Sequence, residues 1–433
     1  MSSLKFQNVT GMPDILPNEQ RIFEYVEKTC FKLADYYGYE KIEVPTLEQS
    51  ELFEKGTGLS TDIVQKQMYN LTTEGGDRLT LRPEFTPSIV RAYIQHGMVS
   101  WPQPVKLSTF GSLFRHERPQ AGRFREFRQF ELDALGEQGP IIDAQVIFVL
   151  FKILATLGIR DITVHINSIG CLKCRPNYRK TLRDYYRGRR KSLCKDCRKR
   201  QKVNVLRLLD CKDEKCSRAK IAAPEIVDFL CESCRIHLKN VLETADYLEL
   251  PYMLSPHLVR GLDYYTKTVF EIIPVVSDSD KEESEGVRQL TLAAGGRFDG
   301  LSKLLGGDDI PAVGGSLGVE RTVAYMRKTE VKIPPAKISR IFFANIGDSA
   351  KRRGMKLIEE LRLAGIYVKE SIGKGSIKTQ MALADKLGVD YVLILGQQEA
   401  AEETVIIRDM ASGSQEVVPI VKIVKELKKR LKK

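Results

Sequence analysis

Residues 114–133 read FRHERPQAGRFREFRQFELD, a stretch with five arginines and four phenylalanines on both sides of a Pro-x-x-Gly turn. This pattern predicts two strands joined by a loop, on which alternate side chains share one face. We therefore expect cations and aromatic rings to line a common floor. Guanidinium groups donate paired hydrogen bonds to phosphate oxygens, and an aromatic ring can stack on a purine. The stretch is compatible with a nucleotide site, although a solvated basic hairpin is the commoner structure for such a sequence taken alone.

The bulk composition predicts a multidomain protein without a membrane span. With 433 residues, the chain has room for roughly two to four domains. No apolar run approaches the ~20 residues of a membrane helix, and the N-terminus lacks a secretory signal, so we expect a cytoplasmic enzyme. The net charge of +12 is concentrated in residues 171–240, which hold 21 Lys and Arg against 8 Asp and Glu. Such a basic segment indicates a polyanionic partner, without distinguishing RNA, DNA and lipid.

Eight of the nine cysteines lie in the same basic segment and form four close pairs. Because no secretory signal precedes them, zinc–thiolate sites are favoured over disulfides. An insertion that leaves the main body and returns brings its ends together, so we expect nested pairing, with the outer pairs joined at the base and the inner pairs near the tip. A single site, or none, stays open. The pairs are Cys171 with Cys174, Cys194 with Cys197, Cys211 with Cys216, and Cys231 with Cys234. The ninth, Cys30, is expected to be a buried small hydrophobe in a helix.

Hydrophobic periodicity and turn residues outline the other elements. Segment 277–286 (SDSDKEESEG) is expected to be a solvated hairpin extension, and Pro334-Pro335 marks a linker. Beyond the linker, strands that alternate with helices predict a small α/β domain with right-handed crossovers. We expect helices at 19–37, 87–95, 141–157, from about 351, from about 376 and in the basic tail, and strands at 79–82, 162–166, 258–273, 289–294, 338–344, 366–369, 390–395 and 404–408.

Several motifs follow one another along the chain in a fixed order. They are Gly11-Met12-Pro13-Asp14, Leu81-Arg82-Pro83-Glu84, Phe114-Arg115-His116-Glu117, Arg260-Gly261-Leu262-Asp263-Tyr264-Tyr265, Ala294-Gly295-Gly296-Arg297-Phe298-Asp299-Gly300 and Gly318-Val319-Glu320-Arg321. As a set they resemble the class II aminoacyl-tRNA synthetases, and the RGLDYY segment resembles the histidyl-tRNA synthetase family in particular. The resemblance covers nearly the whole chain.

The resemblance implies an α+β class II catalytic domain, in which helices flank an antiparallel sheet. We expect this domain at residues 1–168 and 242–333, interrupted at 169–241 by a mostly helical, basic, zinc-binding Cys-rich insertion. An α/β anticodon-binding domain would follow at 336–433. Members of the family are usually homodimers, and here the first helix and the strand around Val44 resemble the region that forms the dimer face.

The activity implied by the resemblance is that of a histidine–tRNA ligase. Such an enzyme activates L-histidine with ATP and Mg²⁺ to histidyl-adenylate and pyrophosphate, and then transfers histidine to the 3′ end of tRNA(His). Because the carboxylate of histidine is already a nucleophile, catalysis is mainly positioning and neutralisation of phosphate charge. The basic insertion would contact the acceptor arm of the tRNA, and the C-terminal domain its anticodon.

The resemblance also implies roles for individual residues at the ATP. Arg115 would hold the α-phosphate, Glu117 would read the adenine edge and Phe127 would stack on the base. Arg123 and Arg321 would bind the γ-phosphate end. Arg260 would be a catalytic cation near the α-phosphate, together with Arg115; a structural salt bridge to Asp263 is the alternative for Arg260.

Histidine recognition would fall to a second group of side chains. By resemblance, Glu84, Thr86 and Gln129 would bind the α-amino group, and Asp133 and Tyr265 would face the imidazole with Tyr264 nearby. A carboxylate can accept the ring N–H while a phenol serves the other nitrogen. The chain departs from the common pattern at two positions, with Asp133 where Glu is frequent and Phe298 where Tyr is frequent.

Three other interpretations share the fold. A catalytically silent regulator that senses histidine would be expected to lack the C-terminal domain or the RGLDYY residues. A module that senses uncharged tRNA would have no need of Arg115, Arg260 and Arg321 facing phosphates. A prolyl, threonyl or glycyl enzyme of the same class would not be expected to carry RGLDYY. The sequence therefore favours the histidine-specific enzyme.

Overall fold

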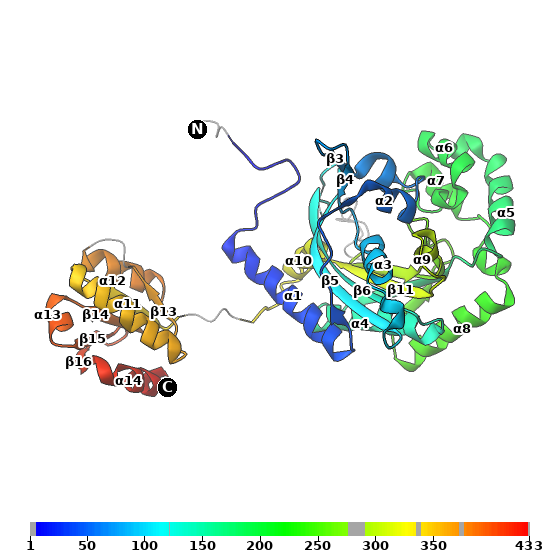
Figure 1. Cartoon of the computed structure of the whole chain (residues 1–433). Coiled ribbons are helices and arrows are strands. Elements are labelled where there is room, and N and C mark those ends of the chain that lie inside the picture. The colour runs from blue at the N-terminus through cyan, green and yellow to red at the C-terminus, as the bar shows by residue number, and fades with distance from the viewer. Residues whose placement is uncertain (1–5, 121, 276–290, 335–338, 372–375, 432–433) are drawn as a thin grey trace. The chain divides into compact units, whose positions relative to one another are not determined.

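Two compact units make up the chain in the computed structural model, Met1–Ile333 and Pro334–Lys433, and Figure 1 shows both. The structure describes residues 6–120, 122–275, 291–334, 339–371 and 376–431. The hairpin extension expected at 277–286 and the first residues of the strand expected at 289–294 lie outside these ranges. Each unit has its own sheet and its own hydrophobic core.

The first unit is built around an eight-stranded sheet with the order β1-β5-β6-β11-β10-β9-β7-β8. The neighbours from β5 to β7 pair antiparallel, whereas β1 pairs with β5 and β7 with β8 in parallel. This confirms the antiparallel-rich sheet expected for the catalytic domain. The strands are β1 (Glu40–Lys41), β5 (Val105–Phe114), β6 (Glu126–Leu135), β7 (Ile162–Ser168), β8 (Tyr252–Leu254), β9 (Thr266–Pro274), β10 (Ala293–Arg297) and β11 (Ala312–Gly318).

Helices α1 and α4 pack against one face of this sheet. The α4 sequence is apolar nearly all round, as expected for a helix covered on both sides. Helix α1 ends where Gly38 adopts a φ of +76°, a conformation that glycine takes without strain. Within the described ranges, no helix is long and apolar enough to cross a bilayer. The helices around the sheet are α1 (Pro17–Tyr36), α2 (Ser50–Gly56), α3 (Thr86–Gln95), α4 (Pro140–Thr156), α9 (Leu301–Leu304) and α10 (Val319–Lys328).

A buried charge network joins α4 to the sheet. The Asp143 carboxylate accepts hydrogen bonds from Arg297 and from the Thr268 hydroxyl, and lies 2.7 Å from Nε2 of His237. The Asp143 and Arg297 side chains are fully buried. Although burial opposes it, the hydrogen bond with His237 and the charge of Arg297 lower the pKa of Asp143. Arg297 and His237 are therefore structural partners of Asp143, and His237 is not placed as a metal ligand.

A small sheet with the order β2-β4-β3 stands beside the large one and leads into α3. Its strands pair antiparallel, and the loop after β4 carries Glu84 directly into the first turn of α3. This connection brings Glu84 and Thr86 to the large sheet. The strands are β2 (Leu47–Gln49), β3 (Tyr69–Thr72) and β4 (Arg78–Leu81).

The segment with the cysteine pairs is mostly helical, as expected, and Figure 1 shows α5, α6 and α7 on the side of the first unit opposite α1. Despite its many charges it has an apolar interior, which includes Tyr178, Leu182 and Tyr186 and is continuous with the core of the sheet. The elements are α5 (Arg175–Arg187), α6 (Lys195–Val203), α7 (Glu214–Lys220) and α8 (Glu232–Tyr247), with short 3₁₀ turns at Arg190–Ser192, Val205–Leu208 and Ile226–Phe229.

The second unit is a small α/β domain, as predicted, with the strand order β13-β12-β14-β15-β16. Strands β13, β12 and β14 are parallel, and β15 and β16 add an antiparallel edge. Strand β16 was not predicted from the sequence. The elements are β12 (Ile341–Asn345), α11 (Asp348–Leu363), β13 (Val368–Glu370), α12 (Ile377–Lys386), β14 (Tyr391–Leu395), α13 (Gln397–Ala401), β15 (Thr404–Asp409), β16 (Gln415–Pro419) and α14 (Ile423–Leu431).

The strand predicted at 258–273 is wrong in its first half. Strand β9 begins at Thr266, and residues 258–265 form an irregular loop. The backbone of this loop is bound by side chains rather than by a neighbouring strand, since Arg207 donates to the Gly261 carbonyl and Arg175 to the Tyr265 carbonyl. The apolar and aromatic composition of the segment is typical of a strand, but tertiary contacts decide its conformation.

Candidate active site

A polar cavity of about 340 Å³ lies on the large sheet. On β6, Phe130 packs edge-on against Phe31 of α1, whereas Phe127, Gln129 and Glu131 on the opposite face line the cavity. Eleven of the twelve residues predicted for ATP and histidine line it, and only Asp133 does not. The eleven are Glu84, Thr86, Arg115, Glu117, Arg123, Phe127, Gln129, Arg260, Tyr264, Tyr265 and Arg321.

One side of the cavity carries arginines that are bound by backbone oxygens. Arg115 Nε donates to the Pro83 carbonyl at 2.9 Å, and its guanidinium lies 5.3 Å from the centre of the Phe127 ring. Arg321 donates to the carbonyl oxygens of Gly122 and Thr291, each at 3.2 Å. Burial, followed by the charges of Arg123 and Arg115, lowers the pKa of Arg321. These cations crowd one another, so an anion between them would relieve their repulsion.

The expected hairpin has a longer loop and a less uniform floor than the sequence predicts. Strand β5 ends at Phe114 and β6 starts at Glu126, so Arg115, Glu117 and Arg123 are loop residues. Arg123 pairs with Glu117 at 3.5 Å. Arg128 lies on the other face of β6, where its backbone N–H donates to Glu320 and its guanidinium covers the Phe23 ring. Because successive side chains of a strand point to opposite faces, Arg128 does not line the cavity.

Arg260 lines the cavity and is held by a carboxylate. Its Nη1 donates to Glu271 on β9, and its guanidinium is 6.0 Å from the centre of the Tyr265 ring. The alternative partner Asp263 instead accepts from Ser60 Oγ and, at 2.9 Å, from Asn204 Nδ2. The salt bridge considered for Arg260 and Asp263 is therefore not formed, and Glu271 is a partner that the sequence analysis missed.

A buried acidic pocket occupies the floor of the cavity. Glu84, 3% exposed, accepts hydrogen bonds from the Thr57 hydroxyl and, at 2.7 Å, from the Tyr264 hydroxyl. Thr86, the first residue of α3, donates to Glu131 on β6. Burial raises the pKa of Glu84, and the two hydrogen bonds oppose this rise. The pocket thus presents two carboxyl groups and two phenols to a small ligand.

Glu131, rather than Asp133, is the β6 carboxyl that reaches the cavity. The two residues share a face of the strand, but Asp133 lies two residues further along β6, opposite Gly314 of β11. A Cβ atom at position 314 would lie 1.9 Å from Asp133 Oδ1, so the glycine makes room for the buried carboxyl. Neither Asp133 oxygen has a hydrogen-bond partner among the described residues, and burial raises its pKa well above the usual value. Phe298 is buried edge-on against Tyr264, with 5.9 Å between ring centres.

Glu131 makes the stability of the ligand-free protein depend on pH. Burial, aided by the charge of Glu84 and opposed by the Thr86 hydrogen bond, raises its pKa to about 8. The folded state therefore binds a proton that the unfolded chain releases above pH ~4.5, and stability falls from there up to about pH 8. We expect Glu131→Gln to gain stability over the parent protein by roughly 3 kcal/mol between pH 5 and pH 8, with little further gain above. Thermal unfolding of both proteins across this range measures the difference.

Glu243→Gln, at a half-exposed glutamate of α8, is the matched control for that comparison. The difference in stability between Glu243→Gln and the parent protein should not grow from pH 5 to pH 8. A Glu131→Gln difference that is constant from pH 5 to pH 9 would contradict a raised pKa for Glu131.

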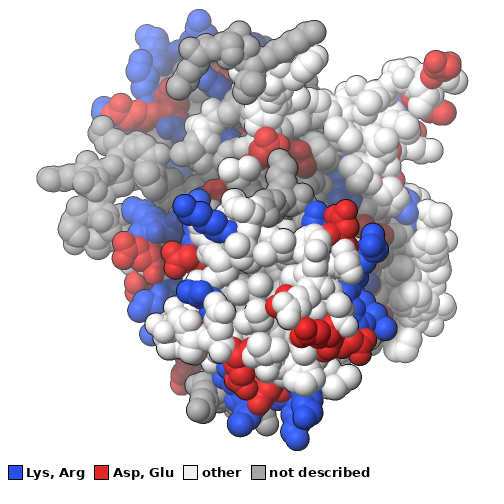
Figure 2. All heavy atoms as spheres, turned by 90° about the vertical axis from the view of Figure 1, so that its left-hand side faces the viewer, with Lys and Arg blue, Asp and Glu red and all other residues white. Residues whose placement is uncertain are grey.

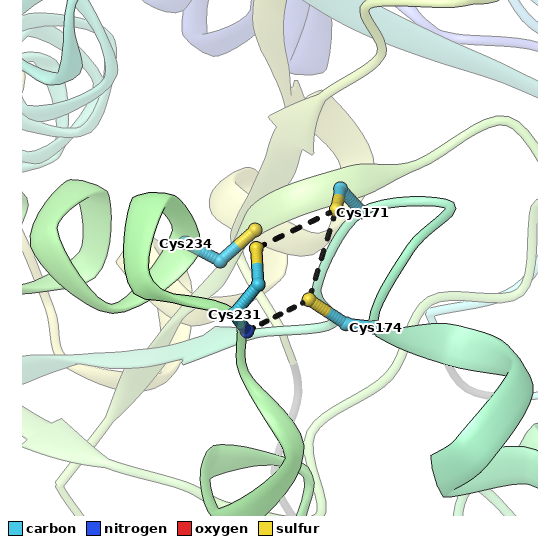
Figure 3. Close-up of side chains that lie close together, drawn as sticks. All are labelled: Cys171, Cys174, Cys231 and Cys234. Atoms are coloured by element: carbon cyan, nitrogen blue, oxygen red, sulfur yellow. Dashed lines mark hydrogen bonds between the residues drawn. The ribbon is translucent and has the colours of Figure 1, made fainter.

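The four cysteine pairs form two clusters with the nested pairing expected. Within each cluster the four sulfur atoms lie within 4.8 Å of one another. Figure 3 shows the proximal cluster, in which Cys171 and Cys174 before α5 point toward Cys231 and Cys234 at the start of α8. The distal cluster comprises Cys194, Cys197, Cys211 and Cys216.

The sulfur positions fit a tetrahedral metal. Cys171 Sγ is 3.7 Å from Cys174 Sγ and 3.9 Å from Cys231 Sγ, and Cys194 Sγ is 3.9 Å from Cys211 Sγ. Four sulfurs at ~2.3 Å from a zinc ion would be about 3.8 Å apart. Backbone N–H groups donate to Cys174 Sγ and Cys216 Sγ, as they do to thiolates. Hydrogen bonds from Ser233 and the Cys234 backbone lower the pKa of Cys231 to about 6, whereas burial raises the pKa of Cys174 and Cys234, so the geometry rather than the pKa supports a metal here.

The face drawn in Figure 2 carries Lys and Arg side chains in small groups interspersed with Asp and Glu, without one large field of either sign among the described atoms. The positive excess of residues 171–240 is not visible as a patch on that face.

Comparisons with known proteins cover the whole chain. Residues 11–322 match the family model described as histidyl-tRNA synthetase, and residues 340–430 match a model described as an anticodon binding domain. A curated histidine–tRNA ligase of Dehalococcoides mccartyi is 40% identical over 98% of this chain and 100% of that protein. One of Caldicellulosiruptor bescii is 39% identical over 99% of this chain and 100% of that protein.

Solved structures match in the same way. The crystal structure of apo S. aureus histidyl-tRNA synthetase has a TM-score of 0.79 and 30% identity, and the match covers 97% of this chain and 99% of that chain. A Bacillus halodurans structure described as an ATP phosphoribosyltransferase regulatory subunit/histidyl-tRNA synthetase has a TM-score of 0.63 at 18% identity. That second likeness shows the fold alone.

Proposed function

The chain belongs to the histidyl-tRNA synthetase family, and we propose that its polar cavity is the site of histidine activation. The protein is a histidine–tRNA ligase, which joins L-histidine to ATP as histidyl-adenylate, releases pyrophosphate and transfers histidine to the 3′ end of tRNA(His). The roles of individual residues, the metal content and the oligomeric state are the parts that we propose.

One observation carries the assignment of the cavity. Arg115 and Arg321 make no ion pair with a carboxylate among the described residues, and both are held by carbonyl oxygens. The same cavity also holds the buried carboxyl groups of Glu84 and Glu131. A site that combines arginines free of ion pairs with buried acidic groups suits a polyphosphate beside an amino acid with a free ammonium group.

The cation side would bind ATP, which enters as its magnesium complex. Arg115 would hold the α-phosphate while Phe127, over which its guanidinium lies, stacks on the adenine. Glu117 would read the adenine edge, and Arg123 and Arg321 would hold the γ-phosphate end. Fixed guanidinium groups stabilise the charge that develops as the carboxylate of histidine attacks the α-phosphorus and pyrophosphate leaves.

The acidic floor would bind histidine. The ammonium group would bind Glu84, Thr86 and Gln129, and Tyr264 would keep the Glu84 carboxylate in place through its hydroxyl. For the imidazole we assign Glu131 and Tyr265, with Glu131 in the role that the resemblance gave to Asp133. A buried pocket of this kind rejects an isostere that lacks the ring N–H by ~10⁴-fold or more, because its polar groups would stay unpaired.

ATP–pyrophosphate exchange tests this proposal directly. The purified protein is assayed with each of the twenty amino acids separately, in the absence of tRNA. Exchange with histidine alone supports both the activation step and the acidic pocket as the selecting element. Exchange with no amino acid would favour the regulatory or tRNA-sensing interpretation instead.

Two structural zinc ions are the metal content that we propose, one in each cysteine cluster. The support is the tetrahedral spacing of the sulfurs and the absence of disulfides among the described cysteines. In the second half-reaction, the anticodon-binding domain would hold one end of the tRNA and the basic insertion its acceptor arm. The cytoplasmic location expected from the sequence stays a prediction.

The protein is expected to be a homodimer. Strand β1 forms the edge of the large sheet, and apolar side chains are exposed near it, with Tyr36 80% and Leu47 45% exposed. Sedimentation equilibrium should give about twice the chain mass of 49.0 kDa. We expect Leu47→Glu to shift the mass toward that of one chain. Tyr247→Glu, at a side chain of α8 that is 90% exposed, is the control that should leave the mass unchanged. A single-chain mass for the parent protein at micromolar concentration would contradict the expectation.

A further inference from the structure

One of the contacts between the cysteine-rich insertion and the rest of the first unit is made with the irregular loop of residues 260–265 (RGLDYY). This loop delivers Arg260, Tyr264 and Tyr265 to the cavity. It has no strand partner, so its conformation depends on what binds its backbone. Two of these backbone contacts come from buried arginines of the insertion.

Each of these arginines is placed by one cysteine cluster. Arg175 follows Cys174 directly, at the start of α5, and its Nη2 donates to the Tyr265 carbonyl. Arg207 lies in the turn between Cys197 and Cys211, and its Nη1 donates to the Gly261 carbonyl at 3.0 Å. Both residues are only 7% exposed, which is unusual for arginine. The loop is thus bound near both of its ends: Arg175, beside the proximal cluster, binds the Tyr265 carbonyl, and Arg207, beside the distal cluster, binds the Gly261 carbonyl.

Further side-chain contacts fix the distal part of the insertion beside the loop. Asn204 donates to Asp263 in the middle of the loop at 2.9 Å. The second amino group of Arg207 pairs with Asp62 at 2.7 Å, and Arg200 pairs with the same oxygen at 2.8 Å. Arg207 itself lines the cavity, together with Asp210 and Lys212 from the same segment. This part of the insertion is therefore a wall of the site.

The surroundings of Arg175 link it to the proximal cluster. Among the described residues it forms no ion pair with a carboxylate, and its Nε has no hydrogen-bond partner. A zinc ion bound by four thiolates carries a net charge of −2, which would compensate a guanidinium buried beside it. Cys171, Cys174, Cys231 and Cys234 would hold such an ion, and its negative complex would explain how the cation is tolerated there.

We propose that the cysteine-rich insertion positions the catalytic loop: Arg175 and Arg207, each ordered by one metal–thiolate cluster, hold the carbonyl oxygens of Tyr265 and Gly261 and thereby place Arg260, Tyr264 and Tyr265 in the cavity. The inference rests on the proposed function of the cavity. It assigns the insertion a part in histidine activation, a step that involves no tRNA. Arg175 and Arg207 are positioning residues, because they act through the loop.

The test compares Arg207→Met with Arg218→Met. Both remove one guanidinium from the insertion, but the Arg218 side chain is 77% exposed and pairs with Glu214 on its own helix α7. In histidine-dependent pyrophosphate exchange without tRNA, we expect Arg207→Met to lower kcat by about 10²-fold, because small misplacements of reacting groups cost that much. The KM for ATP should change by less than about 3-fold, and Arg207→Lys should recover part of the rate, since an ammonium group can still donate to the Gly261 carbonyl.

A readout that does not depend on activity follows the loop itself. Hydrogen–deuterium exchange of a peptide that covers residues 258–265 should be faster in Arg207→Met than in Arg218→Met, with the strands of the large sheet unchanged. Asn204→Ala, at a partly exposed side chain, should speed exchange in the same peptide to a smaller degree. Removal of metal from the parent protein with a chelator should produce the same local effect.

The outcomes separate the possible failures. Unchanged kcat and unchanged deuterium exchange in Arg207→Met would overturn the positioning role, as would a defect confined to aminoacylation of tRNA. Faster deuterium exchange throughout the large sheet would mean that Arg207→Met fails to fold. In that case Asn204→Ala tests the positioning role: unchanged exchange of residues 258–265 in this variant would overturn it. If the parent protein itself shows no pyrophosphate exchange, the proposed function of the cavity fails, while the deuterium exchange still tests the contact between insertion and loop.

Discussion

Replacement of Arg260 by alanine is expected to lower histidine-dependent ATP–pyrophosphate exchange about 10³-fold, without loss of the fold. The guanidinium is held by Glu271 and lines the same cavity as Arg115, so that two fixed cations are available to the α-phosphate. Charge grows on the phosphate oxygens in the transition state, and a cation that is already oriented stabilises it without reorganisation. Exchange kinetics on variants with unchanged circular dichroism measure the effect.

Two controls make the result specific to the Arg260 charge. Arg118→Ala removes an exposed arginine of the same arginine-rich loop as Arg115, one that does not line the cavity, and should exchange at nearly the parent rate. The double variant Arg260→Ala/Glu271→Gln removes the carboxylate that the single variant leaves unpaired. Its rate should stay as low as that of Arg260→Ala. Near-normal activation by either variant would mean that Arg260 serves only as a partner of Glu271.

The sequence predicted the cavity well because its residues lie in short motifs with fixed local geometry. The Arg-rich hairpin, the turn from β4 into α3 and the start of α10 each carry their side chains within a few residues of a strand or helix end. Their meeting at one site follows from the order of strands in the sheet. The nested pairing of cysteines was predictable for a similar reason, since an insertion must return to the strand that it left.

Two features could not be predicted from the sequence: how deeply a side chain is buried, and which residues far apart in the chain contact each other. Glu131 and Asp133 have the same strand parity, so both were compatible with the cavity face, and only the register of β6 against Gly314 buries Asp133 behind it. The loop at 258–265 has the composition of a strand, yet contacts from Arg175 and Arg207 fix it as a loop. Arginines in a basic segment are usually solvated, and nothing local marks these two as buried.

The largest effect on stability is expected from loss of the proximal cysteine cluster. Cys174→Ser should lower the zinc content from two ions per chain to about one, because the three remaining thiolates hold the metal more weakly. The cluster joins the chain leaving β7 to the start of α8, and so closes the insertion onto the sheet. Structural zinc sites contribute roughly 10 kcal/mol or more in small metal-dependent domains. We expect α5 to α7 to lose protection against limited proteolysis, with the large sheet still folded.

Cys30→Ala is the control variant for Cys174→Ser. Cys30 is also a buried cysteine, but it lies in α1 outside both clusters, so its loss should leave the zinc content and the protease pattern unchanged. Elemental analysis and limited proteolysis of the two variants measure both effects. With zinc in both clusters, the insertion would owe its order to metal as well as to its apolar interior of Tyr178, Leu182 and Tyr186. A metal-free protein whose insertion resists protease as well as the parent does would show that this interior suffices and that the cysteines are not zinc ligands.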